Sequence, residues 1–470
     1  ILIVGAGEAG VLALRELKKN FNFNIIGFVD DNISKRGLQL HGKKIFGGRA
    51  CVKNIVSKYD ISEIIIAMPS ATGEVIRNII SCCQFEEVKL RIIPGMYEIL
   101  SGEVEVKLRD VQPEDLLGRE TVKIDEVAIT AFVKNKRVLV TGGAGSIGSE
   151  LVRQIVRFKP ERVIIIDHNE NDLYFLEREF QGSDSKCGVE CIVADCKSVS
   201  VLKHVFSKHL PQIVFHTAAF KHVPLMESNL FSAIENNVIG SRNLIYASEH
   251  YGVESFVLIS SDKAVNPTNI MGATKRITEK LLQAKSQKSR TNFMAVRFGN
   301  VLGSKGSVIP LFEKQIKEGK KVTVTHPDVT RFFMTIKEAV QLVVQASTLG
   351  KGNGEIFVLD MGEQIKILDF ARNLIQLSGL RPEEDIEIEF IGLRPGEKLY
   401  EEPLNDIEKG QSTKYDKIFV TRPEKVDIKE IIRQIKQLEG FVRLRDRENA
   451  VTKIKEMVPT AVLPNFQTSS

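Results

Sequence analysis

The stretch RVLVTGGAGSIGSELVRQIV, residues 137–156, decides the fold of the larger part of this chain. An apolar run leads into Gly142, Gly145 and Gly148, and a helical pattern follows at once. Nineteen residues beyond Gly148, the apolar run VIIID ends on Asp167. Glycines at this spacing let the backbone approach a pyrophosphate at a helix N-terminus, and the spaced acid reaches a ribose. The pattern predicts a Rossmann-like domain that binds a dinucleotide, and the acid favours NAD over NADP.

Further residues around this motif are predicted to contact the cofactor. Ser146 and Ile147 lie between the glycines, where the predicted helix begins. Asp195 closes the run CIVAD, and the third strand of such a sheet reaches the adenine. Ala218 and Ala219, in HTAAF, are small enough for a cofactor to pass. We expect these residues to line the NAD site together with the glycines.

The candidate catalytic groups lie in ISSDKAVNPTNIMGATKR, Ile259–Arg276. This stretch follows the apolar run FVLI, which is typical of a buried parallel strand. Ser261, Asp262 and Lys263 then provide a hydroxyl, an acid and an amine at the carboxyl end of that strand, where open α/β sheets bind ligands. The alternative is a strand-ending turn without chemistry, because Ser and Asp also favour turns.

The beginning of the chain repeats the strand–glycine–helix pattern. Residues 1–10 read ILIVGAGEAG, and the run IIGFVDD brings Asp30 twenty residues after the last glycine. Two further strand patterns, EIIIAMP and LRIIP, alternate with helical ones, which predicts a Rossmann-like domain over residues 1–112. No cluster of titratable residues accompanies this motif, which favours a structural or regulatory domain without chemistry of its own.

The predicted fold class is therefore α/β with two doubly wound, Rossmann-like domains. Residues 113–136 combine weak periodicity, one proline and scattered charges, which is typical of a linker that packs on both neighbours. The second domain is expected to span residues 137–425 and to include a small C-terminal substrate-binding lobe. Residues 426–470 have apolar positions three and four apart, which predicts a helical tail against the body or a partner subunit.

Composition excludes several other classes of protein. The 470 residues are 43% hydrophobic, which is enough for two or three buried cores. The net charge of +5 comes from interleaved acids and bases, so we expect no nucleic-acid partner. The six cysteines form no CxxC pair, which indicates reduced thiols and no metal site. No apolar run approaches the roughly 20 residues of a membrane helix.

Seven motifs carry a resemblance to a known family: TGGAGSIG, HTAAFKHVPLME, NNVIGS, SSDKAVNPTN, RFGNVLGSKGSVIP, TRFFMT and LRPGEK. They occur in this order in nucleotide-sugar 4,6-dehydratases, which are extended short-chain dehydrogenase/reductases acting on UDP-N-acetylglucosamine. The match covers residues 137–402. With its first Rossmann domain, the chain resembles the long branch used in bacterial polysaccharide and protein-glycan synthesis. This resemblance implies a homo-oligomer, and membrane helices before Ile1 that hold it at the cytoplasmic face of the inner membrane.

The resemblance also implies roles for the catalytic stretch. Asp262 is the expected general acid at the 6-hydroxyl, and Lys263 the expected base at carbon 5. Lysine has a reference pKa of about 10.4, so Lys263 needs burial or a nearby cation to act as a base. Most of the superfamily has Tyr four residues before Lys275, where this chain has Met271, and a thioether has no proton to exchange. The proton of the 4-hydroxyl must leave through Ser261, a water or Lys275, which is also expected to hold the nicotinamide ribose.

The nucleotide half of the substrate is expected to meet cations. Arg331 in TRFF and Arg394 in LRPGEK are the candidates for the diphosphate, because a guanidinium forms paired hydrogen bonds with phosphate. By the family pattern, Asn300 also touches the diphosphate, Glu397 binds the uridine ribose, and Lys221 contacts the substrate. The expected reaction is dehydration of UDP-N-acetylglucosamine with retention at carbon 5. The alternatives are a nucleotide-sugar 4-epimerase and a non-catalytic NAD sensor.

Overall fold

The computed structural model of this chain divides into two compact units, and each is described by itself. Unit 1 comprises Ile1–Thr121, Gly306–Asp328 and Ile365–Gly392, and unit 2 comprises Val122–Lys305, Val329–Gln364 and Leu393–Ser470. The structure describes residues 1–19, 23–68, 71, 73–82, 88–93, 108–117, 119, 122–181, 187–402 and 410–464.

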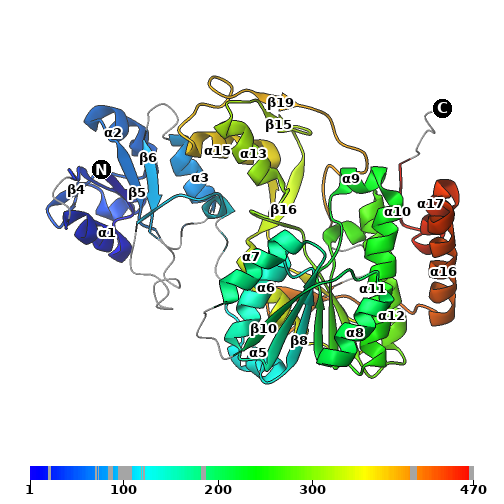
Figure 1. Cartoon of the computed structure of the whole chain (residues 1–470). Coiled ribbons are helices and arrows are strands. Elements are labelled where there is room, and N and C mark those ends of the chain that lie inside the picture. The colour runs from blue at the N-terminus through cyan, green and yellow to red at the C-terminus, as the bar shows by residue number, and fades with distance from the viewer. Residues whose placement is uncertain are drawn as a thin grey trace. The chain divides into compact units, whose positions relative to one another are not determined.

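The N-terminal part of unit 1 is a seven-stranded sheet in the order β3-β4-β2-β1-β5-β6-β7 (Figure 1). Its five inner strands run parallel, and the two outermost strands pair antiparallel. The strands are β1 (Leu2–Val4), β2 (Gly27–Val29), β3 (Gln39–Leu40), β4 (Lys43–Ile45), β5 (Glu63–Ile66), β6 (Lys89–Ile92) and β7 (Arg109–Asp110), and the helices are α1 (Glu8–Lys18), α2 (Val52–Tyr59) and α3 (Gly73–Cys82).

The glycine motif near Ile1 has the geometry that its sequence predicts. Gly5 has φ +109°, and a Cβ on Gly10 would lie 2.1 Å from the Gly5 carbonyl oxygen, so α1 can begin against β1 only without that side chain. Asp30 follows β2 and accepts hydrogen bonds from the Ala6 amide at 2.8 Å and from Lys35 at 2.9 Å. The predicted Rossmann-like fold is therefore confirmed in this unit.

Two later segments of the chain also belong to unit 1. They contain α13 (Val308–Lys317), β15 (Val322–Val324), α15 (Ile367–Leu377) and β19 (Ile388–Phe390). Strand β15 pairs parallel with β19, and α15 packs against α3. Both segments come from inside the predicted domain 137–425, whose limits stay a prediction.

Unit 2 contains a nine-stranded sheet in the order β10-β9-β8-β11-β12-β13-β17-β21-β20. Its first seven strands run parallel in the chain order 3-2-1-4-5-6-7, which is a doubly wound arrangement. The strands are β8 (Arg137–Thr141), β9 (Arg162–Asp167), β10 (Gly188–Val193), β11 (Ile213–His216), β12 (Ser255–Ile259), β13 (Asn292–Arg297), β17 (Ile356–Leu359), β20 (Gln411–Ser412) and β21 (Ile418–Val420).

Helices cover both faces of this sheet, and each face has its own apolar cluster. One cluster joins the sheet to α5 (Glu126–Val133), α6 (Ser146–Arg157), α7 (Glu170–Phe180) and α14 (Ile336–Ser347). The other joins it to α8 (Val199–His209), α9 (Val223–Ser228), α10 (Leu230–Ala233), α11 (Ser241–His250) and α12 (Ile270–Ser286). A π-helical segment, Ile234–Gly240, connects α10 with α11. The parallel strands are nearly continuous apolar runs because both faces are buried.

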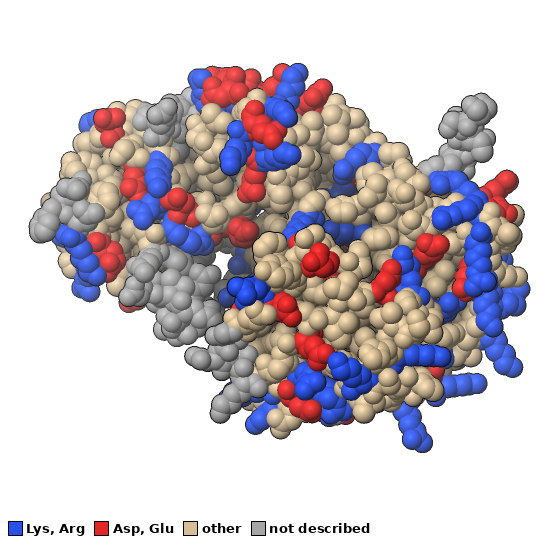
Figure 2. All heavy atoms as spheres, viewed as in Figure 1, with Lys and Arg blue, Asp and Glu red and all other residues tan. Residues whose placement is uncertain are grey.

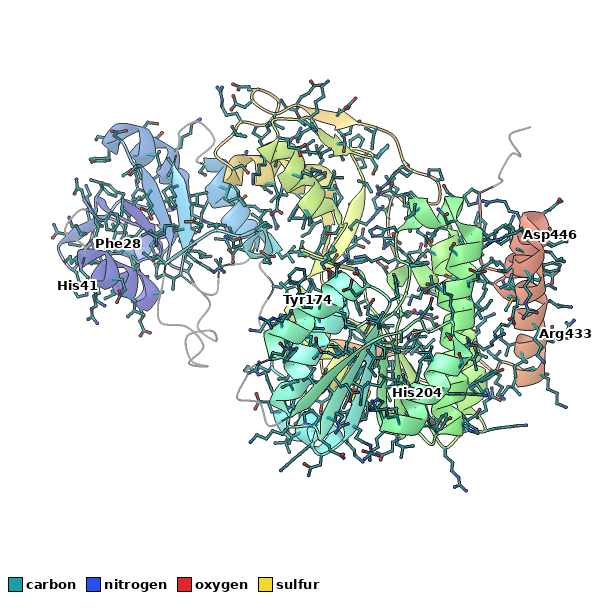
Figure 3. The ribbon with its side chains drawn as sticks, viewed as in Figure 1. Phe28, His41, Tyr174, His204, Arg433 and Asp446 are labelled. Atoms are coloured by element: carbon teal, nitrogen blue, oxygen red, sulfur yellow. The ribbon has the colours of Figure 1, made fainter. Side chains whose placement is uncertain are left out.

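The C-terminal tail forms two helices that pack on the body of unit 2. Helix α16 (Ile428–Leu444) buries one apolar stripe against α12 and the π-helical segment, and α17 (Arg447–Met457) packs on α16. The polar faces point outward, where Figure 3 labels Arg433 on α16 and Asp446 at the start of α17. The Asp446 carboxylate accepts a hydrogen bond from the Asn449 amide and so caps α17.

Charges of both signs are interspersed over the face drawn in Figure 2. This distribution agrees with the interleaved acids and bases of the sequence. Among the residues that the structure describes, no helix has both the length and the apolar character needed to cross a membrane.

Glycine substitutions test how tightly α12 packs. A Cβ on Gly272 would lie 2.1 Å from the Lys263 carbonyl oxygen, whereas a Cβ on Gly440, inside α16, would meet nothing within 4 Å. We expect Gly272→Ala to lower the free energy of unfolding by about 1–3 kcal/mol, because α12 must move away from the candidate catalytic turn. Gly440→Ala should raise it by about 0.5–1 kcal/mol. Urea unfolding measures the free energy of unfolding of both variants. Equal changes in the two variants would contradict the close approach of α12 to the Lys263 carbonyl oxygen.

Candidate active site

The predicted pyrophosphate loop connects β8 with α6. Gly142 has φ +66°, and a Cβ there would lie 2.6 Å from the Ala218 backbone nitrogen. A Cβ on Gly148 would lie 2.3 Å from the Gly142 carbonyl oxygen. Both positions therefore require glycine, and the N-cap Gly145 starts α6 at Ser146. Ile147 follows in the first turn of α6, and a helix N-terminus is the part of a helix that favours a phosphate.

Two predicted acids lie beside this loop. Asp167 ends β9, and its two carboxylate oxygens accept hydrogen bonds from the Ala144 amide at 3.0 Å and the Asn169 amide at 2.9 Å. Asp195 comes two residues after β10 and pairs with Lys197 at 3.3 Å. Asp167 is 8% exposed, which suits a carboxylate that fixes the loop and faces a ribose. The glycines that leave no room for a side chain, and this acid at the end of β9, fit a dinucleotide.

The predicted alanines follow β11 at the same edge of the sheet. Thr217 precedes Ala218 and Ala219 and donates hydrogen bonds to the carbonyl oxygens of Thr141 and Gly142 at 2.7 and 3.0 Å. This segment is therefore tied to the glycine loop. Lys221 comes two residues later. The residue as a whole is exposed, but the protein atoms around its amine partly desolvate it and lower its pKa.

The predicted acid–base pair lies directly after β12. The Asp262 carboxylate is 3.1 Å from the Lys263 ammonium and accepts hydrogen bonds from the Ser261 hydroxyl and the Lys263 amide, both at 2.8 Å. Asn300, on β14 (Asn300–Val301), accepts a hydrogen bond from the Lys263 ammonium at 3.1 Å. The structure thus places Asn300 beside the candidate base. The second oxygen of Asp262 is buried and has no hydrogen-bond partner among the described residues.

The pKa of Lys263 has opposing causes. Burial alone would lower it, but the carboxylates of Asp262 and Glu401 outweigh burial and raise the pKa of Lys263 above its ordinary value. Lys263 therefore carries a proton in this arrangement. A role as base requires that this proton move to a neighbouring group.

Met271 and Lys275 lie on the first two turns of α12. Met271 is 3% exposed and packs in the apolar cluster of this face. The Lys275 ammonium donates a hydrogen bond to the Ile259 carbonyl oxygen at 2.9 Å, at the end of β12. Burial lowers the pKa of Lys275 to about 8, although Glu279 opposes this shift. Lys275 is thus held at the strand end that carries the acid–base pair.

A buried ion pair, which sequence patterns did not reveal, supports this strand end. Glu279 on α12 pairs with Arg297 on β13 through hydrogen bonds of 2.7 and 2.6 Å, and both side chains are fully buried. Glu279 also accepts hydrogen bonds from the Ser260 hydroxyl at 2.6 Å and from Arg276 at 3.0 Å. The charges in TKRITEK look like an ordinary solvated helix face, and only the tertiary packing buries them.

The predicted phosphate-binding arginines converge on one carboxylate. Glu397 accepts hydrogen bonds from Arg331, on β16 (Thr330–Met334), at 2.9 Å and from Arg394 at 3.1 Å. Arg331 is 7% exposed, whereas the side chain of Arg394 is 51% exposed. Burial alone would raise the pKa of Glu397, but the two arginines lower it. The three residues thus form one charged group, which we call the arginine clamp.

A second missed residue is Glu401. Its carboxylate lies 3.5 Å from the Lys263 ammonium and 3.9 Å from the Arg331 guanidinium. The sequence shows two adjacent acids, Glu401 and Glu402, after LRPGEKLY, and nothing local tells which one is buried. The structure buries Glu401 and exposes Glu402.

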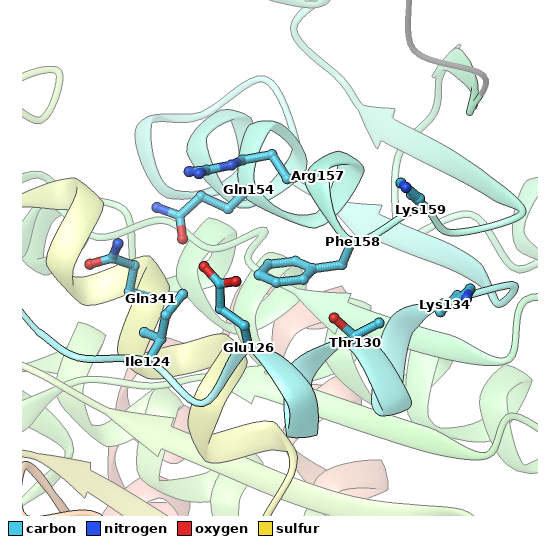
Figure 4. A pocket seen from close by; sticks show the side chains of 9 residues that line it. All are labelled: Ile124, Glu126, Thr130, Lys134, Gln154, Arg157, Phe158, Lys159 and Gln341. Carbon is cyan, nitrogen blue, oxygen red and sulfur yellow. The ribbon is translucent and has the colours of Figure 1, made fainter. Parts of the chain in front are cut away.

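A separate cavity of ≈ 330 Å³ lies between α5, α6 and α14, as Figure 4 shows. Arg157 ends α6 and lines this cavity, whereas Ser146 begins that helix at the glycine loop. A 12-residue helix spans roughly 18 Å, so the end of α6 that lines the cavity is remote from the glycine loop. It is lined by Ile124, Glu126, Thr130, Lys134, Gln154, Arg157, Phe158, Lys159 and Gln341. Within the described ranges, no group of three His, Cys, Asp or Glu side chains is placed to hold a metal ion.

The doubly wound sheet, the glycine loop and the spaced acid define a Rossmann-like fold, and they are consistent with an extended short-chain dehydrogenase/reductase. A family profile described as "Polysaccharide biosynthesis protein" matches residues 138–423. The chain therefore belongs to this family of polysaccharide biosynthesis proteins. The predicted relationship to nucleotide-sugar enzymes agrees with the similarity of this chain to a nucleotide-sugar epimerase and a nucleotide-sugar dehydratase.

The chain is 46% identical over 424 residues to the capsular polysaccharide biosynthesis protein CapD of Staphylococcus aureus, covering 89% of this chain and 70% of CapD. It is 32% identical over 348 residues to a UDP-glucose 4-epimerase of Rickettsia canadensis, covering 69% and 96%. It is 31% identical over 293 residues to an inverting UDP-N-acetylglucosamine 4,6-dehydratase of Campylobacter jejuni, covering 61% and 83%. The X-ray structure of Pen from Bacillus thuringiensis is 37% identical, with TM-score 0.57, covering 62% of this chain and 90% of Pen.

The buried ion pair predicts how stability depends on pH. Burial alone would raise the pKa of Glu279, but Arg297, Arg276 and Ser260 hold it at about 2. Because this folded-state pKa lies below the unfolded value, the pair contributes its full stability above about pH 4.5 and loses it as the pH falls toward 2. A shift of this size corresponds to about 3 kcal/mol. Urea unfolding at a series of pH values measures the loss.

Variants of this pair provide the comparison. Glu279→Gln leaves the Arg297 charge buried without its partner, so we expect a loss of about 3–5 kcal/mol at neutral pH. The double variant Glu279→Leu with Arg297→Met removes both charges and should be less destabilised. If the wild-type protein and Glu279→Gln showed the same acid dependence below about pH 4.5, another carboxylate would be responsible.

Proposed function

We propose that this chain is an NAD-dependent UDP-N-acetylglucosamine 4,6-dehydratase. The observation that carries this proposal is the pair of Asp262 and Lys263, adjacent in sequence and 3.1 Å apart at the carboxyl end of β12. Dehydration across carbons 5 and 6 needs an acid and a base side by side, because one hydroxyl must leave and one proton must be removed. A 4-epimerase needs no such pair.

The NAD site would be formed by the glycine loop and the two acids. Gly142, Gly145 and Gly148 allow close approach of the pyrophosphate, and Asp167 would accept hydrogen bonds from the adenosine ribose. Lys275, held against the end of β12, would donate to the nicotinamide ribose. Bound NAD would accept a hydride from carbon 4 of the sugar and return it to carbon 6.

Met271 cannot take the proton of the 4-hydroxyl, and Ser261 offers another route. The Ser261 hydroxyl donates a hydrogen bond to Asp262 at 2.8 Å. As carbon 4 is oxidised, Ser261 would accept the 4-hydroxyl proton and pass its own to the Asp262 carboxylate. Asp262 would then hold the proton that the departing 6-hydroxyl needs to leave as water. Lys275, whose pKa burial lowers to about 8, is the second candidate for this first transfer.

Lys263 would remove the proton from carbon 5 and later return one to it. The protons balance, because the 4-hydroxyl proton leaves with the water and carbon 5 regains a proton. Retention of configuration requires that Lys263 return the proton to the face from which it came. We expect retention from the family resemblance, whereas the Campylobacter jejuni relative is named an inverting enzyme.

The arginine clamp supports a nucleoside diphosphate as the non-reacting half of the substrate. Two guanidiniums, from Arg331 and Arg394, already face one carboxylate oxygen pair, which is the geometry that a diphosphate also offers. The relatives named for UDP-sugar substrates support uridine as the nucleoside. Glu397 would turn to the uridine ribose once phosphate replaces it at the arginines. Asn300 contacts Lys263, so its role at the diphosphate rests on the resemblance alone.

Proton NMR in deuterated buffer tests the reaction. With UDP-N-acetylglucosamine and wild-type protein we expect a new methyl signal from carbon 6 and deuterium at carbon 5. Asp262→Asn should lower kcat by about 10²–10⁴-fold, because the amide cannot protonate the leaving hydroxyl, and should still bind NAD. Asp369→Asn, an exposed acid on α15, is the matched control and should behave as the wild type.

The same spectra separate the alternatives. A 4-epimerase would convert the equatorial 4-hydroxyl of the substrate to an axial one, without a methyl signal and without deuterium at carbon 5. If the protein bound NAD but left the sugar unchanged, a non-catalytic NAD sensor would be the better interpretation. A parallel reaction in ordinary water keeps a proton at carbon 5, and its coupling to the proton of carbon 4, measured after reduction of the ketone, assigns the configuration at carbon 5.

Asp167 predicts the choice of cofactor. Its carboxylate repels a 2'-phosphate, so Asp167→Asn should lower the preference for NAD over NADP by about tenfold, or about 1.4 kcal/mol. Glu170→Gln removes an exposed carboxylate from the next helix and is the control. Calorimetric titration with NAD and with NADP measures the ratio of the two affinities for each variant. An unchanged ratio in Asp167→Asn would place the ribose elsewhere.

A further inference from the structure

Glu401 is a second carboxylate beside the candidate base Lys263. Its side chain is 3% exposed, and one carboxylate oxygen lies 3.5 Å from the Lys263 ammonium. The other oxygen is buried without a hydrogen-bond partner among the described residues. An ionised carboxylate with an unpaired buried oxygen is costly, whereas a protonated one carries no charge. The surroundings of Glu401 therefore favour its neutral form.

The charges that face Glu401 come from three parts of unit 2. Burial raises the pKa of its carboxyl group, Lys263 lowers it, Asp262 raises it, and Arg331 and Lys398 lower it. The sum is a raised pKa. Arg331 is shared with Glu397 at 2.9 Å, and Lys398 donates a hydrogen bond to the Val265 carbonyl oxygen at 3.0 Å, so neither cation is committed to Glu401.

The charge of Glu401 decides how firmly Lys263 holds its proton. When Glu401 is ionised, two carboxylates face the Lys263 ammonium, and each favours the charged amine. When Glu401 is neutral, only Asp262 does. The proton can then cross the 3.1 Å from Lys263 to Asp262, which breaks an N–H bond, forms an O–H bond and leaves both groups uncharged. That exchange produces the neutral amine and protonated acid that the dehydration needs. Because Asp262 then already holds a proton, the 4-hydroxyl proton goes to the amine of Lys275, the other candidate for that transfer, so one proton enters these side chains for each one that leaves with the water.

We propose that Glu401 is a positioning residue that works as a neutral carboxyl group and thereby lets Lys263 act as the base at carbon 5. This inference deepens the proposed function and rests on it. Glu401 acts through Lys263 and does not itself contact the sugar or the cofactor. The proton count is unchanged by the exchange, and no oxidant or reductant takes part.

The test is the dependence of kcat on pH, with deuterium incorporation at carbon 5 as the second readout. In the wild-type protein, kcat should fall as the pH rises through the pKa of Glu401, because ionised Glu401 keeps Lys263 charged. Glu401→Gln cannot ionise, so its alkaline limb should move up by about one pH unit or more. Glu401→Asp retains an ionisable group and should keep an alkaline limb. Glu402→Gln, at the exposed neighbour that contacts Asn266 at 3.0 Å, should match the wild type.

A measurement without turnover guards against a variant that only misfolds. Infrared difference spectra of the NAD-loaded protein across the neutral pH range should show a protonated carboxyl band that disappears with rising pH. The band should be absent from Glu401→Gln and present in Glu402→Gln. Its persistence in Glu401→Gln would overturn the inference, as would an alkaline limb of kcat that this variant leaves in place. A wild-type protein that turns over no sugar would instead refute the proposed function, while the infrared band would still report on Glu401.

Discussion

The buried pair of Glu279 and Arg297 is the interaction on which the site geometry depends. It joins α12 to β13, and the Ser260 hydroxyl brings in the end of β12 as well. Three elements that carry the candidate chemistry therefore share one carboxylate. Such a pair adds little to stability compared with apolar packing, but it penalises every arrangement that leaves one charge unpaired. Lys275 and the turn at Asp262 are thus fixed relative to each other within a single hydrogen-bonded group.

The proposed reaction requires Lys263 to be neutral and Asp262 to be protonated at the same time. An acid and a base beside one another neutralise each other as an ion pair, and neither then performs its role. Lys263 lies between Asp262 and Glu401, with Asn300 holding its amine from another side. The charge of the whole cluster, more than any single residue, determines which group holds a proton. In the proposed reaction Met271 needs no proton to exchange, because Ser261 or Lys275 would take the proton of the 4-hydroxyl.

The sequence predicted those parts of the site that depend on short spacings. Gly142, Gly148 and Asp167 follow local rules of turn and strand, and Asp262 and Lys263 are adjacent in the chain. Glu279 and Glu401 could not be predicted in this way. The partner of Glu279 is Arg297, 18 residues away, and the partner of Glu401 is Lys263, which belongs to a different motif. An acid in a polar stretch of sequence is expected to be solvated, and only the tertiary fold buries these two. The placement of residues 306–328 and 365–392 with unit 1 likewise depends on long-range packing.

The arginine clamp has a consequence for what this surface accepts. Glu397 acts as an internal counter-ion, so any anion must displace a tethered carboxylate that is always present at high local concentration. A monovalent anion such as chloride gains too little from the exchange. A chelating diphosphate replaces both hydrogen bonds at once and adds a second negative charge. If the clamp is the proposed diphosphate site, this competition would make it selective for a multivalent anion over a single charge.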